Sequence, residues 1–592
     1  MHDRLVSLLQ KALSELGVTD IVPELQVPED VAHGDYATNV AMRLSKILKK
    51  SPVEIANELK ELIIRDQKVS SVKIIDRVEV AGPGFINIFL TEANLINRVS
   101  EVLKQKERFG KARKQKIMVE FADPNPFKEF HIGHLRNIAL GESFSRLLEA
   151  IGHEVRRVNY QGDVGMHVAK SLWGLRKILS EEPKLLSAGK NSREKAAVLG
   201  RAYARGAQAY EKSKEDKEAI IGLNKKVYCE DPSVRDEWKK GRQMSLDYFD
   251  LVYERVGTVF TRFYFESEVA PVGQKIVREH IADGVFEESD GAVIYRGEKK
   301  GLHTRVFIAK EGYATYEAKD MGLAILKAKE YAYDLSIIMT GNEQSEYFKV
   351  MLAALTDIQP ELAAKTRHIP FGMVNLATGK MSSRTGNVVT AEWLIDEVKK
   401  RIAKILDQGG SNYTKREHDD ITEKGAVASV KYAMLKVGAS SDLSFDIEKS
   451  ISFDGDSGPY LQYTYARARS VVRKSQNSKF PSKLRTGKIQ NIAFSIQHLT
   501  LNPEERALAR LISYFPEIVA QAAYQLAPNV LCTYLFRLAQ TFNAFYAKHQ
   551  ILEEASTSDK GAANLRLALT AATAQVLKNG LSLLGIETLE QM

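Results

Sequence analysis

The residues best suited to chemistry are His131 and His134, which flank Ile132 and Gly133. A short apolar run precedes them and a long helical pattern follows, so we expect them at the first turn of a helix. Side chains three positions apart share a helix face, and a helix start offers free N–H groups and the positive end of the dipole. Gly133 leaves space for a flat ring against the backbone. This tetrapeptide predicts a site for the phosphates of ATP.

The surrounding pattern predicts the elements that would position these histidines. Residues 117–121 are strand-like, and Pro124, Asn125 and Pro126 indicate a turn. Residues 134–150 have apolar side chains at helical spacing, Gly152 ends the helix, and residues 154–160 form a second strand-like run. Such a βαβ unit binds nucleotides at the carboxyl ends of its strands. Neither common glycine-rich phosphate motif occurs here, and two surface histidines at a helix start remain the alternative.

A second cluster lies at residues 379–387, where glycines flank cations and hydroxyls. Lys380 and Arg384 are suited to neutralising charge on departing pyrophosphate. Ser382 and Ser383, which follow Met381, are suited to donating hydrogen bonds to phosphate oxygens. By itself the segment also fits a basic surface turn, so it indicates a phosphate site only if it acts together with the two histidines.

Composition narrows the class of protein. The chain has 592 residues, 44% of them apolar, which indicates several soluble domains. Cys229 and Cys532, the only cysteines, are too few for a disulfide framework or zinc cluster, so we expect no zinc and a reducing, cytoplasmic location. No apolar run is long enough for a membrane span, and Lys11 interrupts the first helical pattern, which argues against a signal peptide. The net charge of +9 favours a polyanionic partner such as RNA or DNA.

The pattern along the chain predicts a multidomain α/β protein. A small α/β N-terminal domain is expected at 1–110, with helices over 3–17, 36–49 and 53–65 and strands over 71–80 and 85–90. A catalytic domain with a Rossmann-like parallel sheet is expected at 117–395, with a helical insertion at about 180–258 and strands at 291–295, 304–308 and 335–340. From about 395 the chain is expected to be all-helical, in two parts, 396–470 and 471–592.

The histidine tetrapeptide and the Lys380–Ser383 loop together resemble the signature pair of class I aminoacyl-tRNA synthetases. Longer strings resemble the arginyl-tRNA synthetase family. They are residues 120–125 with Lys128 and 131–137, residues 159–163, residues 368–387, residues 452–463 and residues 565–592. This resemblance extends from about Gly34 to the C terminus.

The resemblance implies a ligase that activates L-arginine with ATP to arginyl-adenylate and transfers the arginine to the 3′ end of tRNA(Arg). It implies Mg²⁺ with the nucleotide, tRNA contacts from the N-terminal domain and from residues 396–470, and an anticodon-binding domain at 471–592. Tyr534, Phe542, Phe545 and Tyr546, near Arg537 and Lys548, either stack on tRNA bases or pack in a core. We expect a monomer without a membrane partner.

The resemblance also implies the site residues. Those that bind ATP would be Lys128, His131, Gly133, His134, Lys380, Met381, Ser382 and Ser383. Glu266, Tyr316 and Asp320 would hold the guanidinium, and Glu120, Asn125 and Gln344 the amino and carboxylate ends of arginine. Two structural alternatives stay open, because Asp320 could cap a helix and Tyr316 could pack in a core.

Four departures from the family pattern are visible. The class-wide loop has a lysine where Ser383 stands, and we hypothesise that Lys128 supplies the missing charge. Lys319 stands where the family often has arginine, and His167 where it often has glutamine; neither belongs to the residues assigned to arginine. Thr385 replaces a frequent lysine.

Other functions also remain open. A synthetase for lysine would use similar carboxylates, whereas one for cysteine would need zinc ligands that the chain lacks. A small-molecule nucleotidyl transferase would share the histidine helix start but would not need a long helical tail. A non-catalytic RNA-binding relative would not need His131, His134 and Lys380 to be intact.

Overall fold

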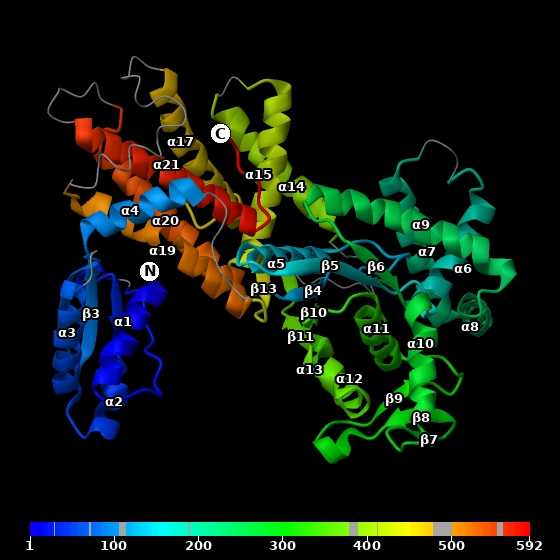
Figure 1. Cartoon of the computed structure of the whole chain (residues 1–592). Coiled ribbons are helices and arrows are strands. Elements are labelled where there is room, and N and C mark those ends of the chain that lie inside the picture. The colour runs from blue at the N-terminus through cyan, green and yellow to red at the C-terminus, as the bar shows by residue number, and fades with distance from the viewer. Residues whose placement is uncertain are drawn as a thin grey trace.

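The computed structural model describes residues 1–28, 30–69, 73–105, 114–186, 190–377, 389–410, 413–477, 500–552 and 560–592. Figure 1 shows an N-terminal α/β domain, a central sheet flanked by helices, and a bundle of C-terminal helices. The expected class is confirmed: a multidomain α/β protein with a parallel catalytic sheet and a helical C-terminal region. No helix among the described residues is both long and apolar enough to cross a membrane.

The N-terminal domain is a three-stranded antiparallel sheet covered by helices. Its elements are α1 (His2–Glu15), η1 (Val31–His33), β1 (Tyr36–Thr38), α2 (Val40–Leu48), α3 (Pro52–Val69), β2 (Ile75–Ala81) and β3 (Phe85–Leu90). The next helix, α4 (Glu92–Gln105), packs instead on α19 (Pro503–Gln525) and α21 (Lys560–Leu583) of the C-terminal bundle. The expectation of one helix over 36–49 is wrong at its start. Tyr36–Thr38 pairs with residues 86–88 of β3, so sheet pairing overrides the helical pattern until Val40.

The catalytic region is built on a five-stranded parallel sheet in the order β11-β10-β4-β5-β6. The strands are β4 (Lys116–Glu120), β5 (Glu154–Gln161), β6 (Arg262–Phe265), β10 (Leu335–Gly341) and β11 (Thr366–Phe371). Helix α5 (Ile132–Ala150) connects β4 to β5 and is buried along nearly its whole length. Strand order reverses at β4, where the chain later returns as β10, and ligands bind at such switch points.

Further helices and a small sheet connect these strands. A helical insertion with its own apolar core comprises α6 (Met166–Glu181), α7 (Ser192–Lys212), α8 (Lys214–Tyr228) and α9 (Pro232–Arg255). The other side carries α10 (Glu266–Glu279), α11 (Tyr316–Glu330), η3 (Asn342–Gln344), α12 (Ser345–Ile358) and α13 (Pro360–Ala364). A small antiparallel sheet is formed by β7 (Glu287–Ser289), β8 (Ala292–Tyr295) and β9 (Arg305–Ile308), with η2 (Gly297–Lys300) between the last two.

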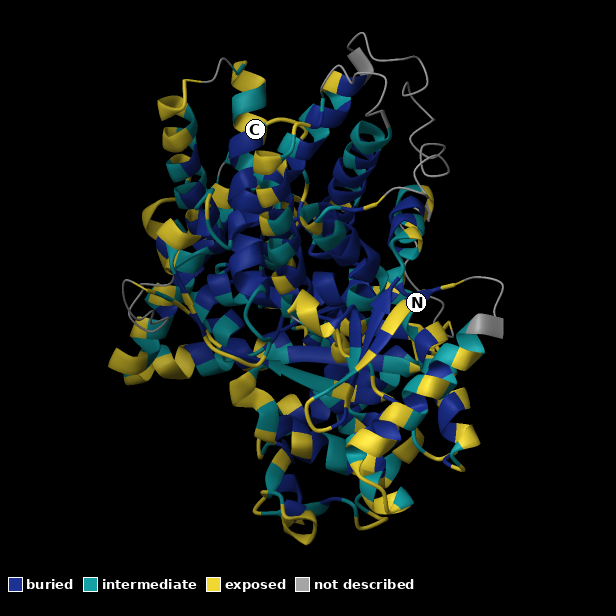
Figure 2. Cartoon of the chain, turned by 90° about the vertical axis from the view of Figure 1, so that its left-hand side faces the viewer, coloured by how far each residue is buried: buried dark blue, intermediate teal, exposed yellow. Residues whose placement is uncertain are grey.

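The C-terminal region is a helical bundle whose inward faces are buried (Figure 2). Its helices are α14 (Ala391–Gln408), α15 (Lys415–Leu435), α16 (Ile447–Ser450), α17 (Gly458–Asn477), α19 (Pro503–Gln525), α20 (Pro528–Lys548) and α21 (Lys560–Leu583). The expectation that the chain is all-helical from about 395 is wrong at one point, because β13 (Leu443–Phe445) pairs in parallel with β12 (Val374–Leu376). This pairing joins the region to the catalytic domain.

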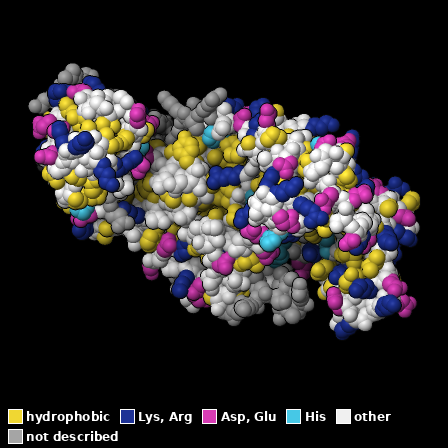
Figure 3. All heavy atoms as spheres, turned by 90° about the horizontal axis from the view of Figure 1, so that it is seen from below, with side chains coloured by type: hydrophobic (Ala, Val, Ile, Leu, Met, Phe, Trp, Pro, Cys, Tyr) yellow, Lys and Arg dark blue, Asp and Glu magenta, His cyan; other side chains and the backbone are white. Residues whose placement is uncertain are grey.

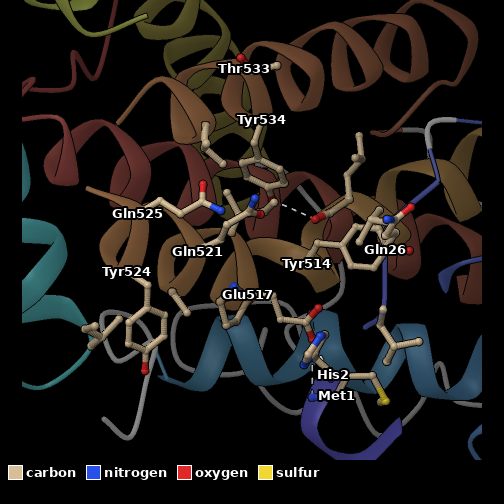
Figure 4. Close-up of a pocket in the computed structure, with 18 of the residues that line it drawn as sticks. Met1, His2, Gln26, Tyr514, Glu517, Gln521, Tyr524, Gln525, Thr533 and Tyr534 are labelled. Atoms are coloured by element: carbon tan, nitrogen blue, oxygen red, sulfur yellow. Dashed lines mark hydrogen bonds and ion pairs between the residues drawn. The ribbon is translucent and has the colours of Figure 1, made fainter. Parts of the chain in front are cut away.

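The N-terminal domain docks on α19 through a buried polar contact. Asp35 forms ion pairs with Arg506 at 2.8 Å and with Arg510 at 3.2 Å. Beside this contact, a cavity of about 1600 Å³ lies between the N terminus and α19 and α20. It appears in Figure 3 as a hollow beside the left-hand lobe, and Figure 4 shows Gln521, Tyr524 and Gln525 along its wall.

Candidate active site

The two histidines meet at the first turn of α5. His131 is the N-cap residue, and its Nδ1 accepts a hydrogen bond from the Gly133 amide at 3.2 Å. The Nδ1 of His134 in turn accepts from the His131 amide at 3.1 Å, and the two rings stack with centroids 3.7 Å apart. A Cβ at Gly133 would lie 3.0 Å from the His131 ring, so glycine permits this close packing. The expected pairing of the histidines on one face is therefore present.

The expected free amides at this helix start are not present. The amide of Ile132 donates to the Val389 carbonyl at 3.3 Å, and that of His134 donates to the His131 carbonyl. The Gly133 amide is taken by the His131 ring. An imidazole whose Nδ1 accepts a hydrogen bond carries its proton on Nε2 when neutral. Among the described residues neither Nε2 has a partner, so the available donors are imidazole nitrogens rather than backbone amides.

Burial keeps both imidazoles neutral. Burial, with a smaller contribution from the positive charge of Lys128, lowers the pKa of His131 to about 4. The same causes, together with His131, hold the pKa of His134 well below its usual value. Neutral imidazoles donate hydrogen bonds from Nε2 without acting as acids near neutral pH. This agrees with a role in holding phosphate.

Lys128 lies in the loop between β4 and α5. Its Nζ lies 5.1 Å from the ring centroid of Tyr203 on α7, so the helical insertion supports it. Burial lowers the pKa of Lys128, and the nearby Lys170 lowers it further. Two cations close together at a half-buried position favour binding of an anion.

The loop that carries Lys128 has an unusual backbone. Ala122, Asp123 and Phe127 all have positive φ, at 78°, 45° and 66°. The surrounding structure holds this conformation, because the Phe127 amide donates to Ser245 Oγ and Asp123 Oδ1 accepts from the Tyr160 amide. Strain in a loop that places side chains at strand ends is typical of functional sites.

The second predicted cluster, Lys380, Met381, Ser382 and Ser383, lies outside the described residues. Both flanks of that segment are described. The Ala377 amide donates to the Phe445 carbonyl at 2.9 Å, and the Ala391 amide donates to the Phe130 carbonyl at 2.8 Å. His131 also forms a β-bridge with Thr390. The chain that follows the segment, from Val389 to Ala391, therefore lies directly beside the first histidine.

The predicted arginine-binding residues gather at the ends of β4 and β5 and on α10 and α11. Asn125 Oδ1 accepts from the Gly162 amide at 3.2 Å. A Cβ at Gly162 would lie 2.4 Å from this oxygen and 3.2 Å from Glu266 Oε1, so this glycine brings Asn125 and Glu266 close together. Gln344, in contrast, lies exposed at the end of η3.

Lysines already neutralise two of the predicted carboxylates. Lys327 Nζ donates to Glu120 Oε2 at 2.7 Å, and Lys319 Nζ donates to Glu266 Oε2 at the same distance. All four of these side chains are nearly inaccessible to solvent. The Oε1 atom of each glutamate accepts no hydrogen bond from the described part of the chain.

Asp320 differs from these glutamates because no described cation pairs with it. It lies on the same helix as Lys319 and accepts a hydrogen bond from the Tyr347 hydroxyl. Burial raises its pKa well above the usual range, and the charges of Glu120 and Glu266 raise it further. The pKa of Asp123 is raised by burial and by Glu120. A ligand that brings positive charge would stabilise both ionised carboxylates.

The structure decides both open alternatives for this pocket. Asp320 lies inside α11, whose N-cap is Thr315, so it does not cap that helix. Tyr316 is 66% exposed and therefore does not pack in a core. Its ring centroid lies 5.3 Å from Lys319 Nζ, at the edge of the carboxylate cluster.

Comparisons with known proteins agree with this arrangement. Residues 98–447 match the family described as tRNA synthetases class I (R), catalytic domain. Residues 3–90 match the arginyl tRNA synthetase N terminal domain, and residues 461–592 match the DALR anticodon binding domain. The chain belongs to the arginyl-tRNA synthetase family.

Full-length relatives support the same assignment. The chain is 32% identical to an arginine–tRNA ligase of Treponema denticola, with 97% of this chain and 96% of the relative covered. It is 33% identical to one from Fusobacterium nucleatum, with coverage of 96% and 95%. The arginyl-tRNA synthetase of Thermus thermophilus superposes with a TM-score of 0.80 at 26% identity over the whole of both chains. The chain is therefore an arginine–tRNA ligase, which activates arginine with ATP and attaches it to tRNA. This excludes a synthetase for lysine, a small-molecule nucleotidyl transferase and a non-catalytic relative.

Sequence reasoning missed several residues of the synthetase pocket. Tyr347, Lys319 and Lys327 all contact predicted carboxylates, and Gly162 lies against Asn125. One signal was available: residues 316, 319, 320 and 327 share a face of α11 at helical spacing. Of the predicted anticodon aromatics, Tyr534, Phe542 and Phe545 are buried, which leaves Tyr546 39% exposed.

Proposed function

We propose that the active site is divided into an anion-binding half and a cation-binding half. His131, His134 and Lys128 hold the phosphates of ATP, with Gly133 permitting the ring packing. Asp320, Glu266 and Tyr316 hold the guanidinium of arginine. The single observation that supports this division most strongly is that Asp320, a buried carboxylate with a raised pKa, forms no ion pair with any described cation.

The chemistry requires positioning and charge stabilisation. The carboxylate of arginine attacks the α-phosphorus of ATP, and the bond to pyrophosphate breaks. The Nε2 donors of His131 and His134, with the charge of Lys128, stabilise negative charge on the phosphates. Lys380, Met381, Ser382 and Ser383 complete the phosphate site by the family resemblance. No protein nucleophile takes part in this step.

Arginine has two further polar groups to be bound. The Oε1 atom of Glu120 accepts a hydrogen bond from the α-amino group, and Asn125 and Gln344 contact the amino and carboxylate ends. Asn125 belongs to the strained turn at 122–127, and this strain supports its proposed role. Mg²⁺ bound with ATP would neutralise part of the phosphate charge.

The remaining regions bind tRNA(Arg). The N-terminal domain at 1–110 and residues 396–470 contact its body, and residues 471–592 bind the anticodon. The exposed ring of Tyr546 supports this role, because Arg467 lies 5.3 Å from its centroid and the pair offers a stacking surface with positive charge. We further propose a cytoplasmic monomer.

A panel of amino acids in ATP–pyrophosphate exchange tests the division of the site. Exchange should be specific for arginine and should appear only when tRNA is present, as the family resemblance implies. Exchange with lysine at a comparable rate would contradict the assignment of the carboxylate pocket. Full exchange without tRNA would contradict the proposed tRNA dependence alone.

A further inference from the structure

Lys319 occupies a cation site made by residues of the arginine pocket itself. Its Nζ donates to Glu266 Oε2 at 2.7 Å and to the Tyr228 hydroxyl at 3.1 Å. The ring centroids of Tyr316 and Tyr228 lie 5.3 and 5.5 Å from the same atom. Lys319 is 4% exposed. Two of the three residues assigned to the guanidinium, Glu266 and Tyr316, therefore already surround an ammonium group.

This arrangement compensates the charge of Glu266 but not that of Asp320. Separating a buried ion pair leaves an uncompensated charge and is strongly unfavourable, so an incoming ligand does not readily displace Lys319 from Glu266. Asp320 has no such partner in the described residues. The positive charge of arginine is thus directed to Asp320, while Glu266 offers only its Oε1 atom, which lies near Gly162 and Asn125.

We propose that Lys319 is a positioning and specificity-determining residue, which neutralises Glu266 and fixes it so that Asp320 alone recognises ligand charge. This inference rests on the proposed function of Asp320 and Glu266. A guanidinium carries five donors in a planar fork and can donate to Asp320 and to Glu266 Oε1 together. A free ammonium needs a compact site of its own, and Lys319 already fills the one made by Glu266, Tyr228 and Tyr316.

The helical insertion takes part in this arrangement. Tyr228 ends α8 and stacks on Tyr313 with centroids 4.5 Å apart. Its hydroxyl supplies the second contact of Lys319. Lys319 therefore joins the insertion to Glu266 at the N terminus of α10, and the position of Glu266 Oε1 depends on both elements.

Chemical rescue tests the proposal. In Lys319→Ala the KM for arginine should rise about tenfold or more while kcat changes less, because Glu266 loses its fixed position. Added propylammonium, which replaces the missing part of the side chain, should lower that KM again, whereas neutral propanol should not. Lys319→Arg should stay within a few-fold of wild type. Lys329→Ala, at an exposed position of the same helix, is the matched control.

A charge-balanced double variant provides a second test that does not depend on rescue. Lys319→Met leaves Glu266 unpaired, and Lys319→Met with Glu266→Gln removes both charges. Because Lys319→Met empties the ammonium site beside Glu266, its preference for arginine over lysine should fall. The double variant, which also lacks the Glu266 charge, should bind both amino acids more weakly than Lys319→Met does, as measured by calorimetry, with thermal melting as a check of folding. An unchanged preference for arginine in Lys319→Met, tighter arginine binding by the double variant, or equal effects of propylammonium and propanol would overturn the proposal.

The outcomes separate this inference from the proposed function. If Asp320→Asn abolishes arginine binding and Lys319→Ala behaves as wild type, only the role of Lys319 is wrong. If Asp320→Asn binds arginine as wild type does, the proposed cation-binding half is wrong, whatever Lys319 does.

Discussion

The two halves of the active site have opposite electrostatic imbalances. Around His131 and His134, burial and Lys128 lower the pKa values of both imidazoles, and Lys170 lowers that of Lys128. Around Asp320 and Asp123, burial and neighbouring carboxylates raise the pKa values. An anion would relieve the first imbalance and a cation the second. We propose that the protein orients its substrates by these uncompensated charges.

The largest expected effect comes from removing the unpaired charge of the cation-binding half. Asp320→Asn keeps the size of the side chain, and we expect kcat/KM for arginine in exchange to fall about 100-fold or more, since a buried charge pair is lost. The KM for ATP should stay near that of wild type. Asp236→Asn, at an exposed position of α9, is the control. An unchanged KM for arginine in Asp320→Asn would contradict the proposal that Asp320 binds the guanidinium.

Lys128 tests the anion-binding half in the same way. Lys128→Met should lower pyrophosphate exchange about 100-fold, because one charge on the phosphates is lost. Arginine binding, measured by calorimetry, should be unchanged, and so should the folded state. Lys184→Met, at an exposed position, serves as control. Near-wild-type exchange by Lys128→Met would exclude the hypothesis that it replaces the missing loop lysine.

The smallest expected effect is a pH dependence, which compares the two halves of the site in the unsubstituted protein. Because the pKa of Asp320 is raised, this carboxyl binds a proton earlier than usual as the pH falls. The KM for arginine should therefore rise as the pH falls, starting at a higher pH than an ordinary aspartate would require. The pKa of His131 is lowered to about 4, so His131 stays neutral until the pH approaches that value. The ratio of the KM for arginine to the KM for ATP should therefore increase as the pH falls from neutrality toward about 5, and a constant ratio would count against unequal halves.

The sequence predicted the elements whose signals are local. Strands β4 and β5 and helix α5 lie within a residue or two of the expected bounds, because apolar periodicity and turn residues define them. Tyr36–Thr38 was misassigned because its partner, β3, lies about 50 positions away. Short β13 was missed for a similar reason, since only its pairing with β12 defines it.

In the active site too, the features set by adjacent residues were predicted, and the contacts between residues far apart in the sequence were not. The histidine turn was expected from adjacent residues, and its geometry agrees. The sequence did not predict that imidazole nitrogens, rather than backbone amides, are the available donors. The amide of Ile132 finds its acceptor, the Val389 carbonyl, only in the fold. The pairing of Lys327 with Glu120 spans 207 positions, and that of Lys319 with Glu266 spans 53, so neither is visible in a single sequence. Charge compensation in the pocket is therefore a property of the tertiary structure.

The most direct test of unequal halves is a crystal structure of the protein with arginine bound. The guanidinium should lie within hydrogen-bond distance of both Asp320 carboxylate oxygens, with Lys319 still paired to Glu266 Oε2. A guanidinium bound to Glu266 in place of Lys319, with Asp320 out of reach, would contradict the account.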